Sequence, residues 1–155
     1  MLRVPFGVGF KLKEPSGQPL RRMATMLREA PRYVQQEAAE AISQGILKLI
    51  DQGFASGSDP MGTAWRPPKD GQSPTMIRSG KLRRGYSVRV VRTGSVGYSI
   101  EITNSTTYAT FLQKGTSKMA PRPQVPGAAL PPLYRDLFKR CYDDAIARWW
   151  AKRGG

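Results

Sequence analysis

The fold of this chain is decided by residues 85–104, which read GYSVRVVRTGSVGYSIEITN. Apolar residues alternate with polar ones on both sides of Thr93-Gly94-Ser95, a group of turn-forming residues. A period of two residues is typical of a strand with one buried face. The stretch therefore predicts a β-hairpin with strands at Gly85–Arg92 and Tyr98–Asn104. The alternating apolar positions are Tyr86, Val88, Val90, Tyr98, Ile100 and Ile102.

Apolar residues that recur every three or four positions precede the hairpin and predict helices. The repeat runs from residue 20 to residue 50 and is interrupted by Pro31. We expect a short helix before Pro31 and a long one over Pro31–Gly53, because proline is tolerated in a first helical turn. Residues 55–79 are rich in Gly, Ser, Pro and Asp and show no period, which predicts a long loop.

Two further helices are expected after the hairpin. Thr106 and Thr107 are candidate caps for a short helix over Tyr108–Lys114, which Gly115 closes. A proline-rich segment separates it from a last amphipathic helix over Pro132–Lys152.

The order of these elements predicts an α+β fold, in which helices cover one face of a small antiparallel sheet. A length of 155 residues is typical of a single domain. We assign residues 1–19 to an extended, irregular N-terminal arm. Residues 20–155 then form one domain, with the long loop 55–79 and the C-terminal helix 132–152.

The composition restricts the classes of function. The 25 Lys and Arg residues exceed the 11 Asp and Glu residues, giving a net charge of +14 that attracts polyanions. The chain contains no histidine, which excludes histidine-based catalysis and histidine metal sites. Cys141 is the only cysteine, so no disulfide can form within the chain. No apolar run approaches the ~20 residues of a membrane span. Because Met1–Phe10 also lacks a signal-peptide pattern, we expect synthesis in the cytoplasm and no membrane association.

No group of residues has the arrangement of a catalytic set. Asp143 and Asp144 are adjacent on a helix, so their side chains diverge. Ser79-Gly80-Lys81 lacks the first glycine and the final Ser/Thr of a phosphate-binding loop. We therefore predict that the chain is not an enzyme and has no cofactor or metal. A hydrolase that depends on an acidic residue such as Asp59 remains an alternative.

Nucleic-acid binding is the stronger alternative. Basic residues are frequent just before the first strand and along it. Tyr86 and Tyr98 are candidates for stacking on bases. Such contact with phosphates would be indifferent to base sequence. The opposing interpretation is that the cations decorate a solvated face while the tyrosines pack on cross-strand neighbours. The candidate contacts with DNA or an acidic partner are Lys81, Arg83, Arg84, Arg89 and Arg92.

A set of turn residues and anchors follows a fixed order from residue 54 to residue 122. Asp59-Pro60 with Gly62 is typical of a tight turn. Trp65 offers a large apolar anchor whose one N–H group needs a partner when buried. We interpret the whole set as loop and assembly anchors, and we expect Gly71–Ile77 to contribute to an interface. The anchors are Phe54, Asp59, Pro60, Gly62, Trp65, Pro67, Gly80, Leu82, Tyr108, Ala109, Gln113, Gly115, Pro121 and Arg122.

Over residues 34–125 this ordered set resembles the phage virion morphogenesis proteins, also called tail completion, head–tail joining or tail terminator-like proteins. The resemblance rests on Phe54 followed by D-P-x-G-x-x-W-R-P, then Ser79-Gly80-Lys81-Leu82, Tyr108-Ala109 and Gln113-Lys114-Gly115. The last motif of the pattern, P-x-R, is shortened here to Pro121-Arg122-Pro123. The arm 1–19 and the helix 132–152 lie outside the shared pattern.

The resemblance implies a structural protein of a tailed-phage virion that acts by assembly. It implies a homo-oligomeric ring, by analogy a hexamer, in the neck or at the head-proximal end of the tail. The expected partners are adjoining neck or connector proteins and tail tube or sheath proteins. Nonspecific contact with DNA in the lumen is a further expectation.

Overall fold

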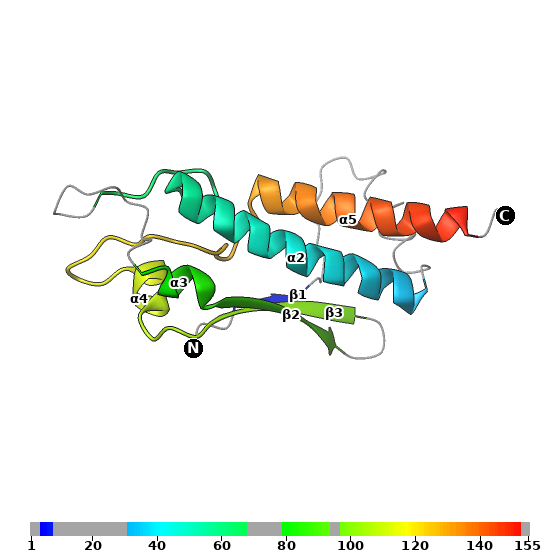
Figure 1. Cartoon of the computed structure of the whole chain (residues 1–155), viewed down its shortest axis with the longest axis horizontal. Coiled ribbons are helices and arrows are strands. Elements are labelled where there is room, and N and C mark those ends of the chain that lie inside the picture. Colours follow the sequence, from blue (N-terminus) through cyan, green and yellow to red (C-terminus); the bar gives the residue numbers. More distant parts are fainter. Residues whose placement is uncertain (1–3, 8–30, 68–78, 94–96, 153–155) are drawn as a thin grey trace.

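The structure is a computed structural model that describes residues 4–7, 31–67, 79–93 and 97–152. These residues form four helices and three strands in the order β1, α2, α3, β2, β3, α4, α5. The long helices and the small antiparallel sheet lie in separate layers (Figure 1). The fold is therefore α+β, as the sequence predicted. The predicted interface segment Gly71–Ile77 lies outside the described residues.

The predicted hairpin is confirmed. Strands β2 (Tyr86–Thr93) and β3 (Gly97–Asn104) pair antiparallel, from Tyr86↔Asn104 to Thr93↔Gly97, without a bulge. The alternation that predicts the strands also determines their faces. Ile100 and Ile102 are fully buried on the side that faces the helices, while Ser87 and Arg89 on β2 are exposed.

The prediction of an entirely irregular N-terminal arm was wrong for four residues. Val4–Gly7 form strand β1, which pairs antiparallel with β3 from Val4↔Ile102 to Gly7↔Ser99. The strand order is β1-β3-β2, so β1 and β2 are the two edges of the sheet. Pro5 is compatible with this place because an edge strand does not need every N–H group for the ladder. The pairing partner lies far along the chain, and a local pattern does not reveal it.

Helix α2 (Arg32–Ser56) extends three residues beyond the C-terminal end of the predicted Pro31–Gly53 helix. It ends at Gly57, whose φ of 68° is in the left-handed region and whose N–H bonds to the Gly53 carbonyl. The extension follows from Phe54, which continues the buried stripe of the helix and is fully buried. The short helix predicted before Pro31 lies outside the described residues.

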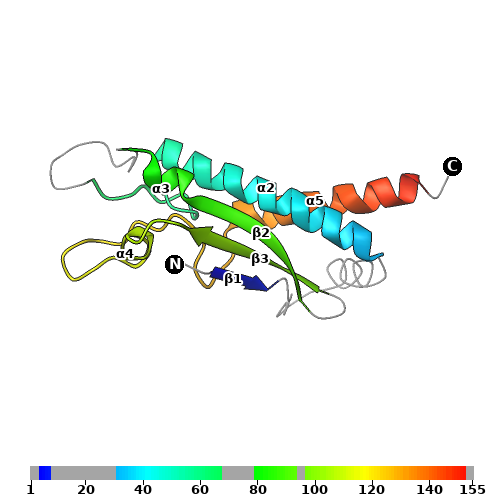
Figure 2. The same cartoon turned by 60° about the horizontal axis from the view of Figure 1, so that its bottom comes forward.

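Helix α5 (Pro132–Ala151) agrees with the predicted Pro132–Lys152 helix to within one residue. It runs antiparallel to α2, and both helices lie on the same side of the sheet (Figures 1 and 2). The two helices approach closely at Gly45, where an added Cβ would lie 2.4 Å from the Leu137 Cδ1 atom. A side chain at Gly45 would therefore separate the helices or displace Leu137.

The core lies between the sheet and the two long helices, and it extends to the loops beyond α2. Val34, Ile42 and Ile46 of α2 are almost fully buried. Residues from α5 and from the connecting segments complete the same cluster. The other large members are Ile50, Phe54, Trp65, Leu82, Tyr86, Ile100, Ile102, Val125, Tyr134, Phe138 and Tyr142.

The two short helices differ from the predictions in detail. Helix α3 (Lys81–Arg84) is a short helix that the sequence pattern did not predict. Helix α4 (Ala109–Lys114) confirms the predicted short helix, but its cap residue is Tyr108 and no side chain caps it. The Thr106 hydroxyl donates instead to the Asn104 Oδ1 atom at 2.7 Å. The prediction of threonine caps was therefore wrong, because Thr106 has a nearer partner.

Candidate functional site

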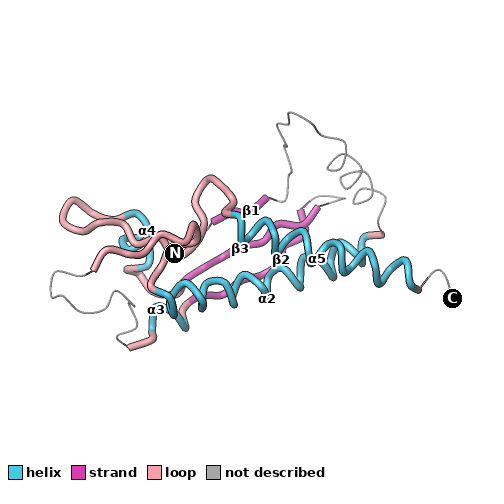
Figure 3. Tube along the Cα trace, turned by 90° about the horizontal axis from the view of Figure 1, so that it is seen from above, coloured by secondary structure: helices cyan, strands magenta, loops and turns pink. Residues whose placement is uncertain are grey.

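Most of the predicted anchors come together at one end of the molecule. This end contains residues 57–67, helix α4 and residues 115–125, which we call the loop end. In Figure 3 it lies away from the C-terminal end of α5. Segments such as those of Trp65 and Pro123, which are 58 residues apart in the sequence, therefore meet here, and their contacts show what each anchor does.

Asp59 closes the tight turn that the sequence predicted. One carboxylate oxygen accepts hydrogen bonds from the N–H groups of Met61 (2.9 Å) and Thr63 (2.8 Å). The Gly62 N–H donates to the Asp59 carbonyl at 2.9 Å, and Gly62 has a φ of 87°. Pro60 lies between them and is half-buried. The carboxylate of Asp59 thus has a structural use in the turn.

Trp65 is an internal anchor, because only 4% of it is exposed. Its ring packs edge-on against Phe54, with 5.7 Å between the ring centroids, and Phe54 also contacts Tyr86. The Trp65 Nε1–H group donates to the Pro123 carbonyl at 2.9 Å. One side chain therefore joins the loop after α2 to the helix itself and to the proline-rich segment.

Gln113 holds the proline-rich segment against α4. Its Nε2 group donates to the Val125 carbonyl at 2.7 Å, and its Oε1 atom accepts from the N–H groups of Gln124 (2.8 Å) and Val125 (3.3 Å). The Arg122 N–H donates to the Leu112 carbonyl at 2.7 Å. These bonds satisfy main-chain groups that no sheet or helix pairs.

Gln124 belongs to the same network, although no sequence pattern predicted it. This buried side chain accepts a hydrogen bond from the Tyr86 hydroxyl at 2.8 Å and donates to the Arg122 carbonyl. Burial raises the pKa of the Tyr86 phenol above its usual value near 10, so the hydroxyl stays protonated and able to donate. The only available signal was a lone amide between two prolines, Pro123 and Pro126.

Two glycines among the predicted anchors have backbone conformations that other residues rarely adopt. Gly115, with a φ of 75°, would place a Cβ 2.8 Å from both the Met119 carbonyl oxygen and the Pro121 nitrogen. Gly80 has a φ of 68° and precedes α3, where Leu82 is buried in the core. Both glycines therefore serve the internal geometry of the chain.

Only some of the predicted anchors face outward. Pro67 and Pro121 are exposed, and Tyr108 is 39% exposed, whereas Ala109 is buried and Arg122 is half-buried. The loop end also exposes two large apolar side chains that the sequence analysis did not select. They are Met61, which is 63% exposed, and Phe111, which is 58% exposed.

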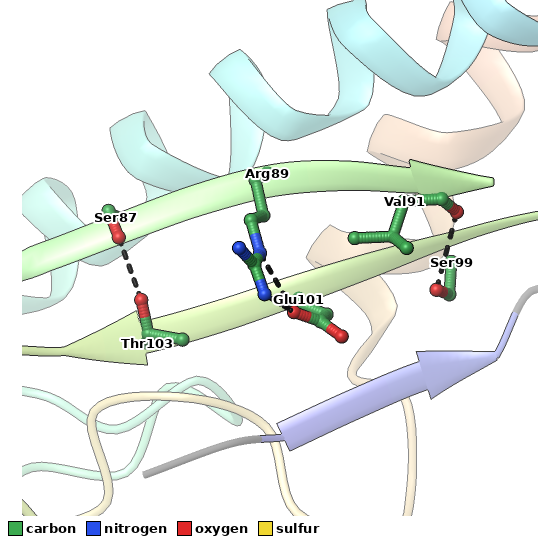
Figure 4. Close-up of polar contacts among 6 residues, drawn as sticks. All are labelled: Ser87, Arg89, Val91, Ser99, Glu101 and Thr103. Carbon is green, nitrogen blue, oxygen red and sulfur yellow. Dashed lines mark hydrogen bonds and ion pairs between the residues drawn. The ribbon is translucent and has the colours of Figure 1, made fainter. Parts of the chain in front are cut away.

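Most of the predicted basic contacts have partners within the protein. The Arg89 guanidinium pairs with the Glu101 carboxylate at 2.6 Å, on the polar face of the hairpin between two further cross-strand contacts (Figure 4). Arg83 pairs with Asp51 at 2.6 Å, and Arg84 donates to the Ser79 carbonyl at 2.8 Å. The hydrogen bond to Asp51, and then its charge, raise the pKa of Arg83.

The remaining two members of that set, Lys81 and Arg92, are exposed, and their side chains have no partner among the described residues. They lie at opposite ends of the α3–β2 segment, because Lys81 begins α3 and Arg92 is near the end of β2. The five cations therefore do not form one continuous set of free charges.

Cys141 lies half-buried on α5, and burial is the main cause that raises the pKa of its thiol. A raised pKa lowers the thiolate fraction and therefore the reactivity. Among the described residues there is no group of three or more His, Cys, Asp or Glu side chains that could hold a metal ion. No helix in the described part of the chain is long and apolar enough to cross a membrane.

Comparison with known proteins gives no match. No family model fits the chain, and no curated protein or solved structure matches it.

Proposed function

We propose that this chain is a structural virion protein of a tailed bacteriophage, which forms a tail-completion or head–tail joining ring. The observation that carries the proposal is the convergence of the ordered anchors in one tightly bonded loop end. Trp65, Gln113 and Gly115 belong to the pattern that resembles the virion morphogenesis proteins, and each one makes a hydrogen bond there. These contacts hold loops in fixed shapes, which is a requirement of a part that must fit other parts.

The exposed apolar side chains on the long helices supply candidate contacts between protomers. Tyr33 and Leu47 on α2, and Leu133 and Trp150 on α5, are all exposed. Aromatic side chains are enriched in protein interfaces because they bury a large area at a small entropic cost. Side-by-side packing of these helices between copies would bury them. Head-to-tail contacts of this kind close a ring when the rotation between copies divides a full turn.

The two edges of the sheet differ in a way that supports the same arrangement. Strand β1 has four residues and contains Pro5, whereas β2 has eight residues, no proline and no bulge. Among the described residues, only β3 pairs with β2. A long, regular edge strand is a template for pairing with another chain. We propose that β2 contributes to the contact between neighbouring protomers.

Size-exclusion chromatography with mass measurement, with and without phage tails, tests this proposal. We expect a particle whose mass is several times the 17.2 kDa of one chain, or a chain that associates with tails. The combined variant Leu133→Ser and Trp150→Ser should shift the mass towards the monomer. Arg135→Ser, an exposed change on the same helix, is the matched control and should leave the mass unchanged. A monomer that has no affinity for tails would overturn the proposal.

A further inference from the structure

The loop end carries a group of positive charges that have no acidic partner among the described residues. The sequence has no Asp or Glu between Glu101 and Asp136. The basic side chains of the loop end are Arg66, Lys114, Lys118 and Arg122, which we call the basic cluster. The ion pairs of the described residues all lie elsewhere, and none includes a member of the cluster. They are Arg83–Asp51, Arg89–Glu101, Lys139–Asp143 and Arg148–Glu37.

Main-chain contacts hold the basic cluster together. The Arg122 Nε group donates to the Arg66 carbonyl at 3.2 Å, and this bond joins the two loops. Lys114 is the last residue of α4, and Lys118 lies in the turn that Thr116 and Met119 close with two hydrogen bonds of 2.9 and 3.2 Å. The four cations therefore belong to segments that hydrogen bonds hold in place. Ordering these segments on binding would cost little further entropy.

Asp59 is the one acidic residue of the loop end, and it does not neutralise the cluster. Its carboxylate oxygen is engaged by the N–H groups of Met61 and Thr63. Four cations against one engaged carboxylate leave a net positive surface. Such a surface attracts polyanions over a distance that salt shortens.

Exposed aromatic rings accompany the cations. Tyr108 and Phe111 lie three residues apart, at the start and on the outside of α4, and Phe111 precedes Lys114 by the same spacing. Residues three apart on a helix are neighbours on its surface. Cations beside exposed rings are the combination that proteins use to bind nucleic acid without reading its sequence.

We propose that the basic cluster binds the phosphate backbone of DNA without sequence preference. This role goes beyond the assembly role and does not depend on ring formation, because each chain carries the whole surface. It also moves the candidate contact away from α3 and β2, where Arg83 and Arg89 are neutralised by Asp51 and Glu101. Each phosphate that the cluster engages releases counterions, so the affinity falls as the salt concentration rises.

Fluorescence anisotropy of the full chain with labelled DNA tests the proposal. The probes are a duplex of about 30 base pairs and a single strand of the same sequence, and the NaCl concentration varies between about 50 and 200 mM. The site variant combines Arg66→Gln, Lys114→Gln and Lys118→Gln. We expect it to lose roughly tenfold or more in affinity and to lower the salt slope by about two to three. Arg122 is left intact because its side chain bonds to the Arg66 carbonyl.

The matched control removes three charges that have acidic partners, through Arg83→Gln, Lys139→Gln and Arg148→Gln. The net charge changes equally in the two variants, so a specific surface predicts that only the site variant loses affinity. Equal losses in both variants would overturn the proposal, because they would show a diffuse effect of net charge. The absence of binding to both DNA forms at the lowest salt concentration would also overturn it.

Two further measurements identify the partner. A polyglutamate of similar length that competes as well as DNA would overturn the proposal in favour of an acidic protein partner. Phe111→Ser separates the two forms of DNA. A loss of affinity for the single strand alone shows that the ring stacks on bases, whereas no loss for either form shows contact through phosphates only. Circular dichroism of each variant confirms that it is folded.

Discussion

Different interactions stabilise the loop end and the rest of the fold, which consists of helices α2 and α5 and the sheet and which we call the helix–sheet body. In the body, periodic apolar residues such as Ile42, Ile46 and Ile100 are fully buried against one another. At the loop end, individual polar contacts from Asp59, Trp65 and Gln113 hold segments that have no periodicity. The body therefore tolerates apolar changes of similar volume. The loop end depends on specific groups, because each buried main-chain group that loses its partner has a large cost.

A substitution at Phe54 tests the contact between the two regions and should have the largest effect on the free energy of unfolding. Phe54 is fully buried and its ring contacts both Trp65 and Tyr86. Phe54→Ala should lower the free energy of unfolding by about 3 to 5 kcal/mol, because it leaves a cavity that joins the regions. Chemical denaturation measures this. The control Phe111→Ala, at an exposed position, should change the free energy by less than about 0.5 kcal/mol. Similar losses in both variants would contradict the placement of Phe54 as the link.

Gly115 tests how far the loop end depends on backbone conformation. Gly115→Ala should cost more than the roughly 1–3 kcal/mol of its rare backbone conformation, because its Cβ would also clash with two backbone atoms. Gly62→Ala is the matched control. Its φ is also positive, but nothing lies within 4 Å of the added Cβ, so only about 1–2 kcal/mol is expected. Thermal and chemical denaturation compare the two variants, and equal effects would show that the clash is relieved.

Gln113 tests the polar contacts directly and should have the smallest effect of the three. Gln113→Leu removes the partners of the Val125 carbonyl and of the Gln124 and Val125 N–H groups, at a cost of roughly 1–3 kcal/mol. Hydrogen exchange at the amides of Gln124 and Val125 should become faster, while exchange at Ile100 in the body should change little. Gln36→Leu, on the exposed surface of α2, is the control. Faster exchange throughout the chain would show that the regions are not separable.

The elements that the sequence predicted are those whose signal is local and periodic. The alternation of residues 85–104 indicated both strands, and the apolar repeat indicated α2 and α5. Strand β1 was missed because its pairing depends on the open edge of β3. The role of Gln124 was missed because its partners, Tyr86 and Gln113, lie many residues away. The sequence pattern also did not distinguish the buried Trp65 from the exposed Tyr108, because exposure depends on tertiary packing.

By itself, the sequence determined the fold class, the positions of the main helices and strands, and the total charge. These properties depend on residue type and on spacing over a few residues, and both are present in the sequence before the chain folds. Only the tertiary structure decided which cations are neutralised. Arg83 meets Asp51, and Arg148 meets Glu37, because separate elements pack together. An ion pair depends on distance in space, and packing sets that distance, so packing decided which cations have an acidic partner.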